Sequence, residues 1–310
     1  LLFPVIGILL FAAIGIKDKV HFVGEMKQIE QLTKLTTQIT ALLHETQIER
    51  GKTSVYMYSL GTRFSDELSA QYQETDKLRD EVSRLLIAFN DQERENNFKS
   101  LLKSVIMELE RLSVLRRDAL ALNIPMLEAI NYYSDLNAKF LKIISVLPSL
   151  SDDSSIYRLS NTYLNLLNGK EKAGLERAVI SGVLTAHSFS PHLYLQAISV
   201  SAQQQMYFDS FSLSALPDYL VLFEKAESSV DSQKVSAIRQ YVQSQVFQSQ
   251  VFKSKTPKII NDFPALLANN ELEAVSPSDE IRPSILQWFT HSTNRINDLK
   301  QVEDSIAVDL

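Results

Sequence analysis

The sequence predicts an all-α protein of two four-helix bundles, built from long antiparallel helices and preceded by an N-terminal transmembrane segment. Three observations lead to this prediction. Apolar residues recur at three- and four-residue spacing over long stretches, and no sustained alternation of apolar and polar residues marks a strand. Prolines and short polar clusters separate these stretches, as helix ends require. The first 16 residues carry no charge.

The uncharged run Leu1–Ile16 is interpreted as part of a membrane-spanning helix, followed at once by the charged residues Lys17–Lys19. A span requires about 20 apolar residues, so the run is slightly short. The core of a secretion signal and a buried helix are the alternatives. At the other end, Trp288–Leu310 has amphipathic spacing and no helix-stopping residue, which favours a second span after residue 310.

The helices between these ends are placed by their apolar spacing and by the prolines and polar clusters that flank them. We expect helices at 18–60, 66–89, 92–122, 125–147, 153–187, 190–213, 217–252 and 279–310. The polar break near residues 148–155 separates two domains of similar size. The expected organisation is a partial transmembrane helix (1–16), a first bundle (17–150), a second bundle (151–275) and a C-terminal helix leading toward the membrane (276–310).

The composition excludes several function classes. The net charge is −6 and the pI about 5.5, so no basic stripe is present to neutralise phosphates, and no nucleic-acid partner is expected. Cysteine is absent, which removes thiolate catalysis and cysteine metal sites. No phosphate-binding glycine loop and no paired nucleophile and base can be found. We therefore expect neither an enzyme nor a bound cofactor.

Two arginines lie on apolar seams of two long helices, the expected helices 18–60 and 153–187. Heptad spacing places Arg50 in line with Leu43 and Met57, and Arg177 in line with Tyr163 and Leu184. Arginine is rarely fully buried without a partner, and burial of its isolated charge is very costly. Each seam therefore requires an anion beside its arginine.

The surroundings of the two arginines match. In each case Glu-Arg is followed by a small residue, and a serine comes four positions after the arginine, at Ser54 and at Ser181. These serines share a helix face with their arginine, and Lys170 lies two turns before Arg177 on its seam. If the arginines face each other, their guanidinium forks suit a small planar oxyanion. Ion pairs with carboxylates of neighbouring helices are the alternative, and the local candidates are Glu45, Glu49, Glu171 and Glu176.

Two segments resemble the motifs of the NIT domain, the nitrate- and nitrite-sensing family. The first is Gln47-Ile48-Glu49-Arg50-Gly51 with Ser54 and Tyr56, and the second runs from Lys170 to Ala178 as Lys-Glu-x-x-Gly-x-Glu-Arg-Ala. The resemblance covers about residues 30–255. It implies an all-helical domain that binds nitrate or nitrite through Arg50 and Arg177. It also implies a further arginine in a later helix, for which Arg239 is the candidate; a solvated helix face is the alternative for that residue.

The expected function is that of a periplasmic sensor domain in a receptor of the bacterial inner membrane, such as a chemoreceptor in chemotaxis. The residues around Trp288, Thr293 and Lys300 resemble the stretch before the second span of such receptors. The expected ligand site comprises Arg50, Arg177, Arg239, Ser54, Lys170 and Ser181. A homodimer is expected by analogy with receptors. The alternatives are a sensor of another small anion or amino acid, and a helical interaction module without a ligand.

Overall fold

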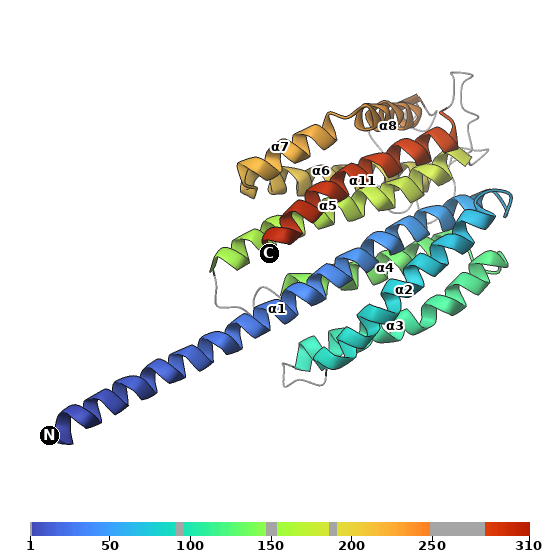
Figure 1. Ribbon diagram of the computed structural model, residues 1–310. Helices are drawn as coiled ribbons and strands as arrows, with labels where there is room; N and C mark the ends of the chain where they lie inside the picture. Colours follow the sequence, from blue (N-terminus) through green and yellow to red (C-terminus); the bar gives the residue numbers. More distant parts are fainter. Residues whose placement is uncertain (1, 91–95, 147–153, 186–190, 249–282) are drawn as a thin grey trace, which may run out of the picture.

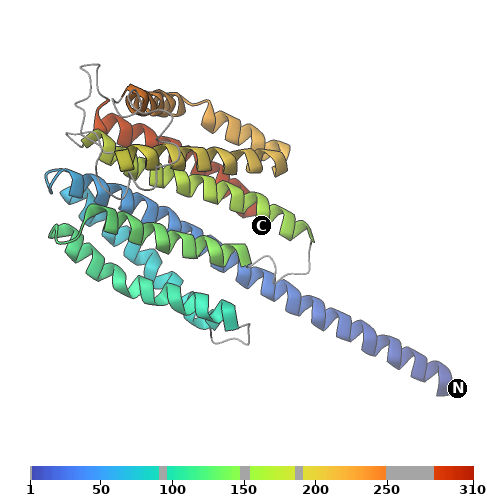
Figure 2. The ribbon, with the colours of Figure 1, turned by 180° about the vertical axis from the view of Figure 1, so that it is seen from behind.

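The computed structural model describes residues 2–90, 96–146, 154–185, 191–248 and 283–310. Within these ranges every regular element is an α-helix, and the long helices run side by side in two layered groups (Figure 1). The prediction of an all-α protein of helical bundles is confirmed. Both groups are seen again from behind in Figure 2, where the first part of the N-terminal helix projects beyond all its neighbours.

The first bundle is formed around a single long helix. The first helix packs against the second, fourth and fifth, while the third packs against the second and fourth. Gly61 closes the turn after the first helix with a φ of +80°, which glycine adopts without steric cost. The bundle consists of α1 (Leu2–Tyr58), α2 (Ser65–Asn90), α3 (Asn96–Leu120) and α4 (Met126–Val146).

The second bundle includes the last helix of the chain. That helix, α11, packs against α5, α7 and α8, while α5 and α6 lie in extended contact. The start of α11 is fixed by a capping box, in which the side chains of Ser284 and Gln287 accept hydrogen bonds from backbone N–H groups that have no partner within the helix. The bundle consists of α5 (Ser154–Thr185), α6 (Pro191–Ser214), α7 (Pro217–Glu227), α8 (Val230–Gln248) and α11 (Ile285–Asp309).

One hydrophobic cluster joins the two bundles. Ile39 and Leu43 of α1, Phe140 of α4, and Leu166 of α5 are all fully buried in it, and so is Leu299 of α11. Full burial of such side chains contributes on the order of 1.5–3 kcal/mol each. The contact of α1 and α4 with α5 therefore belongs to the protein core, and polar groups at this contact are removed from water.

The expected helix 217–252 is divided into two in the structure. α7 ends at Glu227, and α8 begins at Val230 after the pair Ser228–Ser229. The Ser229 hydroxyl accepts a hydrogen bond from the backbone N–H of Ser232, and so caps the new helix. Serine side chains compete with helical backbone bonds in this way, which explains the break. Residues 249–252 of the expected helix lie outside the described residues.

The predicted N-terminal transmembrane segment is not found among the described helices. Leu2–Ile16 forms the start of α1, which continues without interruption to Tyr58. Across the described ranges, no helix combines the length and the apolar character that a bilayer crossing demands.

Candidate functional site

The two predicted arginines meet where α1 and α5 pack together. A Cβ added to Gly51 of α1 would lie 2.8 Å from Nε of Arg177, and one added to Gly174 of α5 would lie 2.9 Å from Nη2 of Arg50. Each guanidinium therefore lies directly against the backbone of the opposite helix. Both arginine side chains are fully buried. The seam positions expected from heptad spacing are confirmed, and the two glycines allow the close approach.

Arg50 has a carboxylate partner on the opposite bundle. Its Nη1 donates to Oε1 of Glu171 at 2.5 Å, and its Nη2 donates to Oε2 at 3.2 Å. Nη1 also donates to the hydroxyl of Ser134 on α4 at 2.9 Å. The same Glu171 carboxylate accepts from the side-chain amides of Gln47 (2.9 Å) and Asn137 (3.0 Å). The positive charge of Arg50 is thus compensated, as the ion-pair alternative predicted.

Within the described ranges, Arg177 has only uncharged hydrogen-bond partners. Its Nη1 donates to the hydroxyl of Thr293 on α11 at 2.9 Å, and its Nη2 donates to the backbone carbonyl of Gln47 at 2.7 Å. The guanidinium carbon lies 5.1 Å from the ring centroid of Phe289. Among the described residues, no carboxylate forms an ion pair with Arg177. A buried arginine in this situation is rare because its charge is costly to desolvate.

The electrostatics of the site reflect this difference. Burial, and then the nearby charge of Arg50, lower the pKa of Arg177 to about 9, while Glu171 acts in the opposite direction. Arg177 therefore still carries its proton at neutral pH. The Nε atoms of Arg50 and Arg177 are both buried without a hydrogen-bond partner among the described residues. The site thus combines an uncompensated positive charge with unused donors, which is the complement of a small anion.

The two predicted serines lie beside the arginines but are bonded to their own helices. The Ser54 hydroxyl donates to the carbonyl of Gly51 at 2.8 Å, and the Ser181 hydroxyl donates to the carbonyl of Arg177 at 2.7 Å. Both side chains are fully buried. The hydroxyls that contact the guanidinium groups are instead those of Ser134 and Thr293, which come from other helices.

Lys170 is fully buried and forms an ion pair with Glu303 of α11. The structure therefore places Lys170 in a contact between α5 and α11, rather than against the two arginines. His44 of α1 lies nearby. Burial, followed by the positive charges of Lys170, Lys300 and Arg177, lowers the pKa of His44 to about 2. His44 is accordingly a neutral side chain on the Arg177 side of the site.

Arg239 lies within the second bundle and is not brought together with Arg50 and Arg177. Its Nε and Nη2 each donate to the Glu176 carboxylate at 2.6 Å, and Nη2 also donates to Gln204 at 2.5 Å. The first bundle holds an equivalent pair, in which Arg116 donates to both oxygens of Glu49 at 2.8 Å. Both glutamates of the Glu-Arg motifs thus bind an arginine of their own bundle.

Several residues of the site were missed from the sequence. Ser134 and Thr293 belong to helices far along the chain, and no local pattern distinguishes them from other hydroxyl residues. Phe289 and Trp288 lie on one side of Arg177, and Trp288 donates its indole N–H to the Arg177 carbonyl at 3.0 Å. Arg116 of α3 is buried against Glu49. Only knowledge of the helix packing could have found these contacts.

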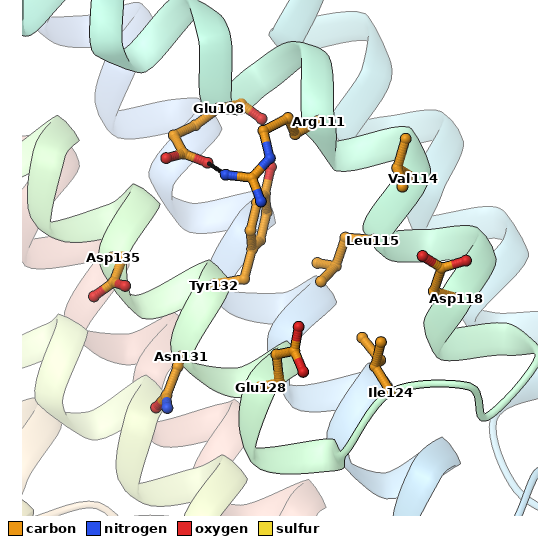
Figure 3. Close-up of a pocket in the computed structure, with 10 residues that line it drawn as sticks. All are labelled: Glu108, Arg111, Val114, Leu115, Asp118, Ile124, Glu128, Asn131, Tyr132 and Asp135. Atoms are coloured by element: carbon orange, nitrogen blue, oxygen red, sulfur yellow. Dashed lines mark hydrogen bonds and ion pairs between the residues drawn. The ribbon is translucent and has the colours of Figure 1, made fainter.

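A separate groove of about 300 Å³ lies on the surface of the first bundle, between α3 and α4 (Figure 3). Its side chains include four carboxylates and one arginine, Arg111, whose guanidinium is held by Glu108 at 3.3 Å. This negative lining does not suit an anion. Within the described ranges, no group of three or more histidine or carboxylate side chains could hold a metal ion. The carboxylates are Glu108, Asp118, Glu128 and Asp135.

Comparison with known proteins identifies the family. The family model for nitrate and nitrite sensing (NIT) matches residues 41–310. A nitrate regulatory protein of Klebsiella oxytoca is 27% identical over 290 residues, which cover 92% of this chain and 64% of that protein. The chain thus spans less than two thirds of that relative. The solved structure of the NasR transcription antiterminator has a similar fold, with a TM-score of 0.74 at 23% identity over 95% of this chain and 73% of that one.

These comparisons correct the expected function and location. The similar proteins are a nitrate regulatory protein and a transcription antiterminator, so the prediction of a periplasmic sensor domain in an inner-membrane receptor is wrong. A chemoreceptor role and a membrane anchor have no support. The apolar face of the last helix, including Ile296, Leu299 and Val302, is buried in the protein core. The solved protein of similar fold is a transcription antiterminator, which contrasts with the expectation of no nucleic-acid partner for this chain.

Proposed function

The chain belongs to the nitrate- and nitrite-sensing family, and from this premise we propose that it is a sensory module that binds nitrate or nitrite between α1 and α5. The ligand contacts in this proposal are the guanidinium groups of Arg50 and Arg177. Ser134 and Thr293 position these groups, because each hydroxyl accepts a hydrogen bond from one of them. The role is sensory rather than catalytic.

The observation that carries the proposal is the buried, uncompensated charge of Arg177. A monovalent anion beside it would replace the lost hydration and accept the hydrogen bonds that its Nε does not make within the described protein. Guanidinium offers parallel N–H donors in one plane, and nitrate and nitrite offer coplanar oxygens that accept only. The same geometry explains why a spherical anion would use the site less well.

The output in this proposal is the control of transcription, which is the role of the antiterminator with a similar fold. A ligand shifts a conformational equilibrium only by its difference in affinity for the two states. An anion bound between Arg50 and Arg177 contacts both bundles at once, so it would favour the arrangement in which α1 and α5 hold the two guanidinium groups close together.

Calorimetric titration with nitrate, nitrite, chloride and acetate tests the proposal. We expect binding of nitrate or nitrite in preference to chloride and acetate, accompanied by a higher melting temperature. Arg177→Lys keeps a positive charge but loses the planar fork. Nitrate or nitrite should therefore bind at least about tenfold more weakly to this variant, a change of about 1.4 kcal/mol.

Arg239→Lys is the matched control, because Arg239 is also paired with buried groups but faces Glu176 inside its own bundle. Its effect on anion affinity should stay within about twofold. A loss equal to that of Arg177→Lys would place Arg239 in the ligand site as well. A folded wild-type protein that binds none of the four anions would refute the proposal.

A further inference from the structure

The Glu171 carboxylate occupies the position opposite Arg50 that a planar oxyanion would take. Its two oxygens accept from the two Nη atoms of Arg50 at 2.5 and 3.2 Å, in the side-by-side arrangement of a fork. Carboxylate, nitrate and nitrite are all planar, delocalised anions with two or more equivalent acceptor oxygens. Glu171 therefore presents to Arg50 the same chemistry as the proposed ligand.

The remaining donors around Glu171 also suit an anion. Gln47 and Asn137 donate their side-chain N–H groups to Oε2, and all of these donors belong to α1 or α4, whereas Glu171 belongs to α5. Glu171 is nearly buried, with 5% of its surface exposed. The carboxylate therefore binds across the contact between the bundles, and the same donors could hydrogen-bond to a free anion.

The charges of the site leave room for one monovalent anion. Arg50 and Arg177 contribute two positive charges and Glu171 one negative charge, so the three groups carry a net charge of +1. His44 of α1 is neutral, because burial and nearby positive charges lower its pKa to about 2. One nitrate or nitrite would bring the site to neutrality, which buried ionic groups require.

We infer that Glu171 is a built-in competitor for the anion, and that nitrate or nitrite binds by displacing its carboxylate from Arg50. This inference rests on the proposed function. Displacement leaves Glu171 with the amide donors of Gln47 and Asn137, so its charge is not stranded without hydrogen bonds. Arg50 is then free to share the anion with Arg177. Glu171 thereby sets the anion concentration at which the module responds, and it disfavours anions that bind a guanidinium fork less well than a carboxylate does.

The test is a nitrate titration of the whole chain as wild type, as Glu171→Gln and as Glu49→Gln. Glutamine keeps the size of the side chain and removes its charge, so Glu171→Gln should bind nitrate at least about tenfold more tightly. Glu49→Gln is the matched control, because Glu49 is a buried carboxylate in the same fork geometry that faces Arg116 instead. Its nitrate affinity should remain within about twofold of the wild type.

A second variant guards against a folding defect. Glu171→Asp keeps the charge and withdraws it by one methylene from Arg50, so nitrate affinity should rise, but by less than in Glu171→Gln. Nitrate binding to the wild type with equal or weaker binding to both Glu171 variants overturns this inference and leaves the proposed function standing. Nitrate binding to Glu171→Gln without binding to the wild type contradicts the proposed function, and this inference falls with it. Binding to none of the proteins overturns both.

Discussion

α1 and α5 carry the same Glu-Arg pair, and the two bundles use its members in the same way. Glu49 binds Arg116 of α3, and Glu176 binds Arg239 of α8, so each glutamate is neutralised inside its own bundle. Each arginine of the pair instead faces the opposite bundle and donates to a hydroxyl of a further helix. These hydroxyls are Ser134 for Arg50 and Thr293 for Arg177.

The two halves differ in one respect, the group that compensates the arginine. The motifs are offset by 177 − 50 = 127 residues, and at this offset Glu171 on α5 corresponds to His44 on α1, since 171 − 44 = 127. Glu171 is an anion paired with Arg50, whereas His44 is neutral and does not compensate the positive charge of Arg177. Two similar sequence motifs thus need not carry the same charges around their arginines.

The largest expected effect comes from removal of each arginine in turn. Arg50→Met leaves the Glu171 carboxylate buried without its counter-charge, and should lower the free energy of unfolding by about 3–5 kcal/mol. Arg177→Met removes a buried charge that has no carboxylate partner among the described residues, and should change that free energy by less than about 1 kcal/mol. Urea unfolding at constant m-value measures both. Equal losses in the two variants would contradict the difference in compensation.

The next effect is a dependence of stability on acid pH that originates from His44. Its pKa is lowered from 6.5 to about 2 in the folded protein, so the unfolded chain binds a proton more readily. The contribution of neutral His44 is complete above pH 6.5, and stability should fall by about 1.4 kcal/mol for each pH unit below it. Urea unfolding between pH 7 and pH 4.5 measures this slope. In His44→Gln this part of the pH dependence of the free energy of unfolding should disappear. An unchanged slope in that variant would show that other groups cause the pH dependence.

A carboxylate placed opposite Arg177 should make the two halves alike. His44→Glu adds a negative charge near Lys170, Lys300 and Arg177, the cations that surround His44. Nitrate affinity should fall about tenfold, which corresponds to about 1.4 kcal/mol. The neutral variant His44→Gln serves as its control in the same calorimetric titration and should bind within about twofold of the wild type. A tenfold loss in both would indicate a steric rather than an electrostatic cause.

The smallest expected effect is a difference in nitrate affinity between alanine substitutions at the two glycines. Gly51→Ala places a Cβ 2.8 Å from Nε and 3.0 Å from Nη2 of Arg177, so this guanidinium must move. Gly174→Ala places one 2.9 Å from Nη2 of Arg50, which Glu171 already holds. We expect a loss of nitrate affinity of about threefold or more for Gly51→Ala, and a smaller loss for Gly174→Ala. The opposite order would assign the main ligand contact to Arg50.

Much of this architecture could be predicted from local signals. Apolar spacing and the prolines Pro191 and Pro217 placed helix starts at or within a residue of those observed. Heptad spacing placed Arg50 and Arg177 in the interior, because a residue seven positions from other core residues lies on the same face of a helix. The amphipathic spacing of the last helix did not distinguish a helix that leads to a membrane from one packed in a bundle, where its apolar face lies in the structure.

The linear order of residues was sufficient for the helical class, the family motifs and the need for an anion beside each buried arginine, since these depend on periodicity and on the cost of an isolated charge. It could not decide which anion each arginine has. That choice depends on side chains far along the chain, such as Glu171, which lies 121 residues from Arg50. An ion pair forms only where helix packing brings the two charged groups within about 4 Å. Only the tertiary structure shows that Glu171 forms the ion pair with Arg50 and that Arg177 has no carboxylate partner in the described protein.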